Sequence, residues 1–274
     1  MRAAVLGSPV AHSLSPHLHR AAYEGLGLYG WRYEAIECDE AGLPALIGGL
    51  GPEWAGLSLT MPLKRAVLPL LDTVSDLAVE VGGANTVIFS NGAGHGENTD
   101  VHGIVQALAE AGVPRPGQAT ILGGGATAAS ALAALRELGL HEADLVVRDP
   151  ARARETAEAA ERLGMTLRVR TFDRLGTVPE ADLVVSTLPA GAADGFAGPL
   201  ARVPALFDVV YTPWPTRLAA AVAAHGGIVV GGFPMLLHQA VRQVEMMTGR
   251  SGVPVEAMRA AGKAEIVRRA APAS

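Results

Sequence analysis

The stretch Ala119-Thr120-Ile121-Leu122-Gly123-Gly124-Gly125-Ala126-Thr127-Ala128 decides the fold of this chain. A short strand runs into three glycines, and an alanine-rich segment typical of a helix follows. Small residues at Gly123, Gly125 and Ala128 occupy the three positions of a dinucleotide-binding fingerprint. They let the backbone approach a pyrophosphate, whose charge is favoured by the helix N-terminus. A glycine-rich loop by itself is often only a tight turn, but strand, loop and helix in this order predict dinucleotide binding.

Apolar runs and helical patterns alternate beyond this stretch. Helices over 127–138 and 151–163 are rich in small residues, which pack closely against strands. We therefore predict a doubly wound, Rossmann-like parallel sheet, with strands at 119–122, 144–148, 183–187, 206–210 and 227–230.

The N-terminal part has the same α/β rhythm. Ser15 before Pro16 predicts a helix N-cap, and a helix is also expected over 64–71. Helices over 101–112 and 235–248 would leave and re-enter this part, and a last helix over 254–269 has a basic end. We expect a substrate-binding and catalytic domain over 1–102, completed by 235–274, and a nucleotide-binding domain over 103–234.

Composition excludes several classes of protein. The net charge of −5 gives no general basic field for a nucleic-acid backbone. Cys38 is the single cysteine, so no internal disulfide framework is expected, as is usual in the cytoplasm. The uncharged run 218–241 is long enough for a membrane span, but Gly226, Gly227 and Pro234 interrupt it. We expect a cytoplasmic protein without a nucleic-acid or membrane partner, either a monomer or a homodimer.

The second strand of the nucleotide unit ends at the position where ribose selectivity is usually decided. Arg148 and Arg152 can hold a 2′-phosphate from two sides, which favours NADP. Asp149 can instead accept hydrogen bonds from the unphosphorylated ribose of NAD. A third interpretation makes Asp149 an N-cap before Pro150 and leaves both arginines exposed to solvent.

Polar residues in the first part form four groups that the fold does not require. Ser13-Leu14-Ser15 lies beside a helix N-terminus, a natural place for a carboxylate. The other groups are the segments Ser58-Leu59-Thr60-Met61-Pro62-Leu63-Lys64, Gly83-Ala84-Asn85-Thr86 and Asn98-Thr99-Asp100.

In their order and spacing these groups resemble shikimate dehydrogenase, whose pattern pairs Ser-x-Ser, Thr-x-Pro-x-Lys, Asn-Thr and Asn-Thr-Asp with a glycine-rich loop. The resemblance extends to Asp208-Val209-Val210-Tyr211-Thr212-Pro213 and to 235–240, and so spans essentially the whole chain. It implies reversible NADPH-dependent reduction of 3-dehydroshikimate to shikimate, a step of aromatic amino-acid (chorismate) biosynthesis. The chain departs from the family pattern in two places. Gly124 and Thr127 stand where the family often has alanine, and alanine or glycine, and this change is benign. Val147-Arg148-Asp149 stands where NADP members commonly have Asn-Arg-Thr, and this change leaves the choice of cofactor open.

The resemblance also implies residue roles. Ser13 and Ser15 would bind the substrate carboxylate, and Lys64 and Asp100 would take part in the chemistry and contact the substrate. Further substrate contacts would be Thr60, Asn85, Tyr211 and Gln239, and further cofactor contacts Thr187, Val209 and Gly232.

The chemistry of ketone reduction supports catalytic roles for Lys64 and Asp100. Reducing a ketone needs a proton donor near the oxygen that becomes an alcohol, and Lys64 can donate while Asp100 accepts hydrogen bonds. Alternatively, Lys64 is a surface lysine and Asp100 caps the following helix. No metal is predicted, because the histidines show no ligand spacing and a lysine supplies the proton.

Three other functions fit the same features less well. An NAD-dependent quinate/shikimate dehydrogenase shares nearly every motif and differs around Asp149. A nucleotide-sensing regulator has no need of Lys64 with Asp100. Dehydrogenases of folate-like or tetrapyrrole-precursor substrates leave Ser13 and Ser15 unexplained.

Overall fold

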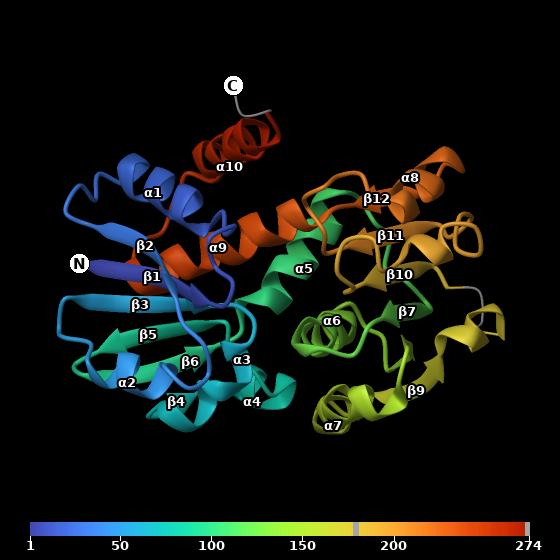
Figure 1. Cartoon of the computed structure of the whole chain (residues 1–274), viewed down its shortest axis with the longest axis horizontal. Coiled ribbons are helices and arrows are strands. Elements are labelled where there is room, and N and C mark those ends of the chain that lie inside the picture. The colour runs from blue at the N-terminus through green and yellow to red at the C-terminus, as the bar shows by residue number, and fades with distance from the viewer. Residues whose placement is uncertain (178–180, 272–274) are drawn as a thin grey trace. The chain divides into compact units, whose positions relative to one another are not determined.

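The computed structural model describes residues 1–177 and 181–271, and the side chains of 152 and 175–177 also lie outside the description. The chain divides into two compact units (Figure 1). Unit 1 comprises Met1–Val79, Gly83–Thr99 and Gln239–Ser274, and unit 2 comprises Glu80–Gly82 and Asp100–His238. Within the described residues, no helix is both long and apolar enough to cross a membrane.

Unit 1 contains a mixed six-stranded sheet in the order β2-β1-β3-β5-β6-β4. β1 pairs in parallel with β2 and β3, whereas β5 runs antiparallel to β3 and β6. The strands are β1 (Arg2–Gly7), β2 (Arg32–Glu37), β3 (Trp54–Leu59), β4 (Thr73–Val74), β5 (Thr86–Ser90) and β6 (Ala93–Glu97).

The β5–β6 hairpin was missing from the sequence prediction. Asn91 and Gly92 form its turn, with φ of 53° and 81°. An Asn-Gly pair with both residues at positive φ fits the hairpin turn whose twist matches the flanking strands. The Asn-Gly pair that predicts this hairpin was therefore present in the sequence.

The helices of the N-terminal part are short, except α1 (Ser15–Gly25). The prediction of Ser15 as N-cap was off by one residue, because α1 begins at Ser15 itself and Leu14 is the N-cap. The helix expected over 64–71 breaks into two pieces, since Pro69 follows after one turn. The remaining elements are α2 (Leu43–Gly48), α3 (Leu63–Ala66), η1 (Leu68–Leu70), α4 (Asp76–Val81) and, near the C-terminus, α10 (Val255–Ala270).

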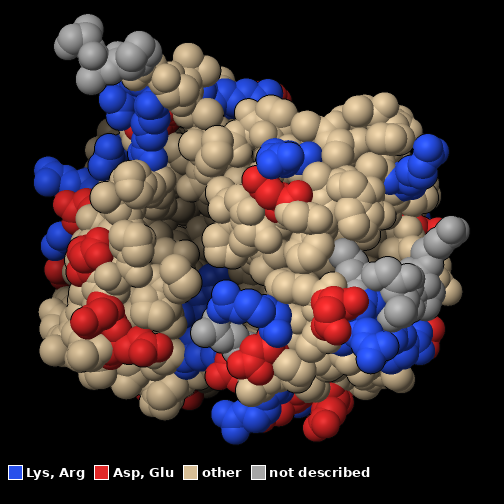
Figure 2. All heavy atoms as spheres, turned by 45° about the vertical axis from the view of Figure 1, so that its right-hand side comes forward, with Lys and Arg blue, Asp and Glu red and all other residues tan. Residues whose placement is uncertain are grey.

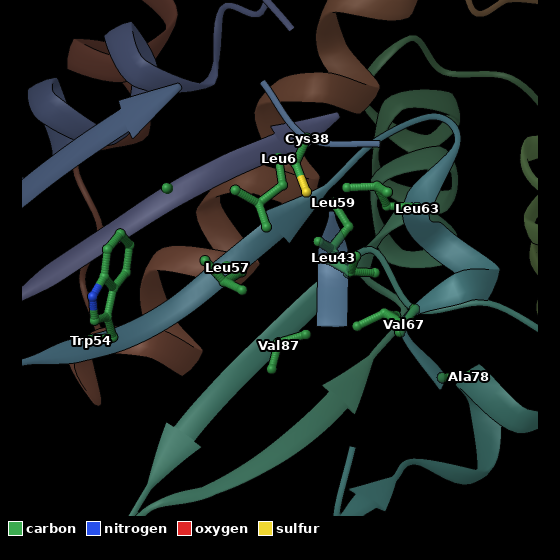
Figure 3. Close-up of a cluster of buried hydrophobic side chains, with 12 residues drawn as sticks. Leu6, Cys38, Leu43, Trp54, Leu57, Leu59, Leu63, Val67, Ala78 and Val87 are labelled. Atoms are coloured by element: carbon green, nitrogen blue, oxygen red, sulfur yellow. The ribbon is translucent and has the colours of Figure 1, made fainter. Parts of the chain in front are cut away.

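The core of unit 1 lies against the sheet (Figure 3). Leu6, Leu57 and Val87 come from β1, β3 and β5, and each is completely buried or nearly so. Leu63 and Val67, from the short helix segment, fill the space beside them. Packing of α3 onto this core fixes the segment that carries Lys64.

Unit 2 contains a six-stranded sheet, entirely parallel, in the order β12-β11-β10-β7-β8-β9. The predicted doubly wound parallel sheet is thus confirmed. The strands are β7 (Ala119–Leu122), β8 (Glu142–Val147), β9 (Thr166–Thr171), β10 (Leu183–Ser186), β11 (Ala205–Asp208) and β12 (Ile228–Val230).

The edge strand β9 was not predicted, because charged residues interrupt its apolar pattern. Arg170 pairs with Asp144 of β8 at 2.8 Å, and Arg168 pairs with Glu142 at the same distance. Charged edges of this kind disfavour pairing with another chain. On the face drawn in Figure 2, cationic and anionic side chains likewise lie next to one another.

The other helices of the chain include α6 and α7, which pack together in unit 2. Two of them, α5 and α9, each contain a boundary between the units. Their bounds are α5 (Thr99–Glu110), α6 (Ala126–Glu137), η2 (Pro150–Ala153), α7 (Arg154–Arg162), η3 (Phe172–Thr177), η4 (Asp194–Phe196), α8 (Arg217–Ala224) and α9 (Gly232–Thr248).

Candidate functional site

The glycine-rich loop of unit 2 joins β7 to α6, in the middle of the parallel sheet. Gly123 has φ of +99°, and a Cβ there would lie 2.7 Å from the Thr187 hydroxyl. Only glycine fits both the backbone angle and the space. Gly125 is the extended N-cap residue of α6 and has no side chain to cover its first amides. Ala126, Thr127 and the buried Ala128 form the first turn, so the loop has the geometry that a pyrophosphate requires.

Two threonines hold this loop. Thr187, directly after β10, donates a 2.8 Å hydrogen bond to the carbonyl of Leu122. Thr156, fully buried on α7, donates a 2.9 Å hydrogen bond to the carbonyl of Gly124. Sequence analysis singled out Thr187 but missed Thr156, whose only signal is a hydroxyl on the apolar face of a helix.

The ribose segment follows β8. Arg148 is exposed, whereas Asp149 is the N-cap of η2 and accepts a 3.0 Å hydrogen bond from the amide of Ala151. The capping interpretation of Asp149 is therefore correct, and its carboxylate already has a structural role. Arg152 belongs to η2, but its side chain lies outside the described part of the chain.

The loops after β10 and β11 complete this edge of the sheet. The amide of Val209 donates to Ser186 at 3.0 Å, and the carbonyl of Val209 faces Gly232. A Cβ on Gly232 would lie 1.9 Å from that carbonyl oxygen, so glycine is required for the close approach. Buried Asp208 accepts from the amide of Val210 at 3.2 Å and from the hydroxyl of Thr216 at 2.8 Å.

This carboxylate fixes both ends of the loop that carries Tyr211. Thr216 is also the N-cap of α8, and its hydroxyl accepts from the amide of Ala219. Burial raises the pKa of Asp208, and the hydrogen bonds from Thr216 and Val210 oppose that rise. Tyr211 itself is half-buried.

In unit 1, the Ser-x-Ser group lies in the loop between β1 and α1. The hydroxyl of Ser13 accepts a 3.2 Å hydrogen bond from the amide of Ser15. The amide of Ser13 donates to the carbonyl of Val10 at 2.9 Å, which tightens the turn. Ser15 is 5% exposed and opens α1, so both hydroxyls lie at a helix N-terminus.

Thr60 and Lys64 flank the turn after β3. The amide of Thr60 donates to the carbonyl of Leu6, and its own carbonyl accepts from the amide of Leu63. Lys64, half-buried on α3, accepts a 2.8 Å hydrogen bond from the amide of Ala84 at its carbonyl. The backbone of the lysine is therefore tied to the residue next to Asn85.

A buried polar network connects Asn85 with Gln239, although 154 residues separate them. The amide nitrogen of Asn85 donates to Oε1 of Gln239 at 3.4 Å. Oδ1 of Asn85 accepts from the Thr86 hydroxyl at 2.9 Å and from the amide and hydroxyl of Thr99 at 2.7 and 3.1 Å. The structure thus brings together two predicted substrate residues and the segment that precedes Asp100.

The network continues through residues to which sequence analysis gave no role. Gln243 donates to the Thr86 hydroxyl at 3.0 Å and accepts from the Ser58 hydroxyl at 2.8 Å. Ser58 in turn accepts from the hydroxyl of Tyr33 at 2.6 Å. The one available signal was spacing, because Gln239 and Gln243 are four residues apart and share a helix face.

Asp100 is 5% exposed and belongs to unit 2, as does Tyr211. The expectation that Asp100 caps a helix over 101–112 was wrong, because α5 begins at Thr99 and ends at Glu110. Asp100 lies in the first turn, where a carboxylate interacts favourably with the helix dipole. Across residues 1–177 and 181–271, no cluster of three His, Cys, Asp or Glu side chains is arranged to hold a metal.

Comparison with known proteins identifies the family of this chain. Residues 5–87 match the model of the shikimate dehydrogenase substrate binding domain, and residues 232–261 match that of the shikimate 5′-dehydrogenase C-terminal domain. A shikimate dehydrogenase (NADP⁺) of Thermus thermophilus is 38% identical over 271 residues, which cover 96% of this chain and 99% of that protein. The chain belongs to the shikimate dehydrogenase family.

Solved structures agree with this assignment. Mycobacterium tuberculosis shikimate dehydrogenase is 46% identical with a TM-score of 0.88, covering 96% of this chain and 99% of that one. The Thermus thermophilus enzyme in complex with NADP(H) and shikimate is 36% identical with a TM-score of 0.86 over the same shares. The predicted family and the predicted two-part α/β fold are both confirmed.

Proposed function

We propose that this chain is an NADP-dependent shikimate dehydrogenase, which reversibly reduces 3-dehydroshikimate to shikimate in the chorismate pathway. The observation that carries the proposal is the buried hydrogen bond between Asn85 and Gln239. It joins two of the substrate residues that the family resemblance implied, although 154 positions separate them in the chain. A chain that kept only the fold would have no need to bury this pair.

The residues of unit 2 fit a dinucleotide. Gly123 packs closely against Thr187 and Gly232 against the Val209 carbonyl, which holds the loops at this edge of the sheet together, and Gly125 leaves the N-terminus of α6 uncovered. Pyrophosphate would lie on residues 123–128, next to Thr187, and the nicotinamide side would face Val209 and Gly232. When bound, NADP exchanges a hydride with the substrate carbon. Residues 103–234 would serve as the cofactor domain.

Residues 1–102, with 235–274, would supply most of the substrate contacts, and Tyr211 of unit 2 would supply one more. Ser13 and Ser15 would donate to its carboxylate, and Thr60, Asn85, Tyr211 and Gln239 would contact the carboxylate or ring hydroxyls. Lys64 would give a proton from Nζ to the carbonyl oxygen during reduction and take one back during oxidation. Asp100 would accept a hydrogen bond and hold the lysine in place.

NADP is favoured over NAD because the carboxylate of Asp149, which could otherwise bind the ribose of NAD, already serves as the N-cap of η2. Its carboxylate accepts from the amide of Ala151, whereas Arg148 is exposed at the end of β8. The same carboxylate supports a second candidate, an NAD-dependent quinate/shikimate dehydrogenase, because an acidic residue at this position can also bond a ribose.

Absorbance at the nicotinamide band tests both candidates, with shikimate or quinate and NADP or NAD in all four combinations. We expect the highest kcat/KM for shikimate with NADP. The highest kcat/KM for NAD would select the second candidate, and no turnover in any combination would overturn both. We further propose a cytoplasmic monomer or homodimer, which sedimentation of the purified protein would distinguish.

A further inference from the structure

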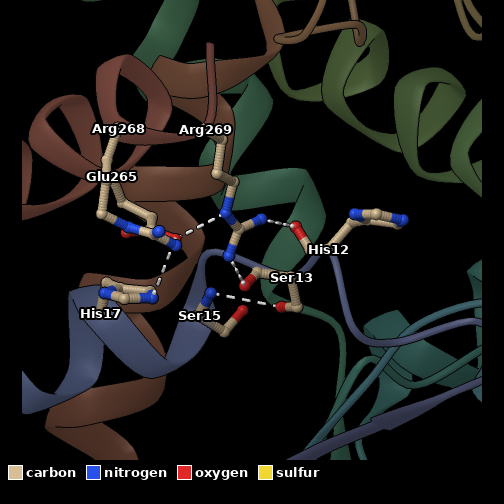
Figure 4. A network of polar contacts seen from close by, with 7 residues as sticks. All are labelled: His12, Ser13, Ser15, His17, Glu265, Arg268 and Arg269. Carbon is tan, nitrogen blue, oxygen red and sulfur yellow. Dashed lines mark hydrogen bonds and ion pairs between the residues drawn. The ribbon is translucent and has the colours of Figure 1, made fainter. Parts of the chain in front are cut away.

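The loop between β1 and α1, residues 8–14, is held from both ends by charged side chains that are distant in sequence. At its start, the carboxylate of Glu37 accepts hydrogen bonds from the Ser8 hydroxyl at 2.7 Å and from the amide of Val10 at 3.1 Å. At its end, Arg269 of α10 donates to the carbonyl of His12 at 2.6 Å and to the carbonyl of Ser13 at 3.3 Å (Figure 4). An arginine 256 and 257 positions away thus fixes its main chain.

Glu265 holds the guanidinium of Arg269 in this position. Its carboxylate accepts from Nε of Arg269 at 2.6 Å and from Nε and Nη2 of Arg268 at 2.7 Å. The Glu265 side chain is 5% exposed, and the two arginines lower its pKa to about 2. It is therefore anionic at every pH at which the protein would be assayed.

A planar guanidinium suits this arrangement because its five N–H groups point in fixed directions. With Nε on Glu265, both terminal nitrogens of Arg269 remain for the two loop carbonyls (Figure 4). Arg268 differs in the relevant respect: its side chain is 71% exposed and its hydrogen bonds end on Glu265. Because Arg268 also binds Glu265, the control position is Lys263, an exposed cation on the same helix.

We propose that Arg269 is a positioning residue for the substrate carboxylate, acting on the main chain of His12 and Ser13 so that the Ser13 and Ser15 hydroxyls keep their binding geometry. This inference rests on the proposed function for its substrate. It assigns α10 a role in binding, in addition to its packing against α1. Figure 4 shows the chain of contacts from Glu265 through Arg269 to the loop.

The test compares Arg269→Ala, Glu265→Gln and the control Lys263→Ala with the parent protein. Shikimate binding is measured by calorimetry, together with steady-state kinetics for shikimate and NADP. Arg269→Ala should raise the Kd and KM of shikimate about tenfold, because hydrogen bonds from a charged group are lost. Its kcat and its KM for NADP should change less than about twofold, Glu265→Gln should act in the same direction, and Lys263→Ala should resemble the parent.

Amide hydrogen exchange over residues 10–15 provides a readout that does not depend on turnover. Arg269→Ala should accelerate exchange there and leave β3 protected, whereas a general loss of stability would affect both segments. Unchanged exchange and unchanged shikimate binding in Arg269→Ala, or equal weakening by Lys263→Ala, would overturn the inference. If the parent protein itself binds no shikimate, the proposed function fails, and the exchange measurement alone decides whether Arg269 orders the loop.

Discussion

The hydroxyl of Thr156 on α7 donates a 2.9 Å hydrogen bond to the carbonyl of Gly124 in the glycine-rich loop. Thr156 is fully buried, so water does not compete for this bond. The contact links the helix that follows the ribose segment to the loop expected to bind the pyrophosphate. Two parts of the proposed nucleotide site are thereby held in a fixed relationship.

Replacing Thr156 with Val removes this hydroxyl and nearly preserves the side-chain volume. A neutral hydrogen bond contributes about 1 kcal/mol, which corresponds to a rise of roughly fivefold in the KM for NADP. The KM for shikimate at saturating NADP should stay within about twofold of the parent. Thr166→Val, at an exposed threonine in β9, is the matched control. An unchanged KM for NADP in Thr156→Val would show that the contact does not shape the loop.

Lys64→Ala should reduce kcat by about 100-fold or more, because general acid–base catalysis contributes on that scale. The KM for shikimate should change far less, since the proton is transferred in the transition state. The sequence contains one other lysine, Lys263, which is exposed on α10. Lys263→Ala should behave like the parent in the same steady-state assay. A folded Lys64→Ala enzyme with near-parental turnover would refute the role of this lysine.

Substituting both Arg148 and Arg152 with Ala should lower kcat/KM for NADP by about tenfold or more and leave that for NAD nearly unchanged. Only NADP carries the 2′-phosphate that a guanidinium can hold. Asp149 should remain the N-cap of η2, and its charge would then disfavour the phosphate further. Added salt should imitate part of the effect in the parent by screening. An unaltered ratio of kcat/KM for the two cofactors would mean that these arginines are only solvent-exposed residues at the start of a helix and do not bind the phosphate.

His19 predicts a dependence of stability on pH. Its ring is fully buried and stacks on Tyr33, with centroids 3.8 Å apart and planes 20° from parallel. Nδ1 is 2.9 Å from the carbonyl of Ser15, so Nδ1 carries the proton and donates. Burial lowers the pKa of His19 from 6.5 to about 4, and the Ser15 hydrogen bond opposes this in part.

Between these two pKa values the unfolded chain binds a proton on His19 that the folded chain does not. The free energy of unfolding therefore decreases as the pH falls from about 6.5 towards 4, by about 2 kcal/mol between pH 7 and pH 5. Urea unfolding at both pH values measures this. His19→Phe, which keeps the aromatic stack, should reduce the difference between the two pH values by about that amount. An equal pH dependence in the variant and the parent would contradict the lowered pKa.

The sequence by itself determined the nucleotide half of the fold. Gly123, Gly125 and Ala128 between a strand and a helix have few structural alternatives, because local backbone geometry dictates small residues there. The buried parallel strands could also be predicted, since each is a short apolar run between turns. The edge strand β9 could not be predicted, because its arginines pair with the carboxylates of β8 and interrupt the apolar pattern.

The substrate half depended on contacts between segments that lie far apart in the chain. Sequence motifs named Asn85 and Gln239, but only the tertiary structure joined them and added Tyr33, Ser58 and Gln243 to the same buried network. Likewise, nothing in the local pattern of Arg269 distinguishes it from Arg268, because both are basic residues in the last turn of a helix. Hydrogen bonds between residues 154 to 257 positions apart leave no periodicity in the sequence, so packing of α9 and α10 onto the N-terminal sheet and helix decided these roles.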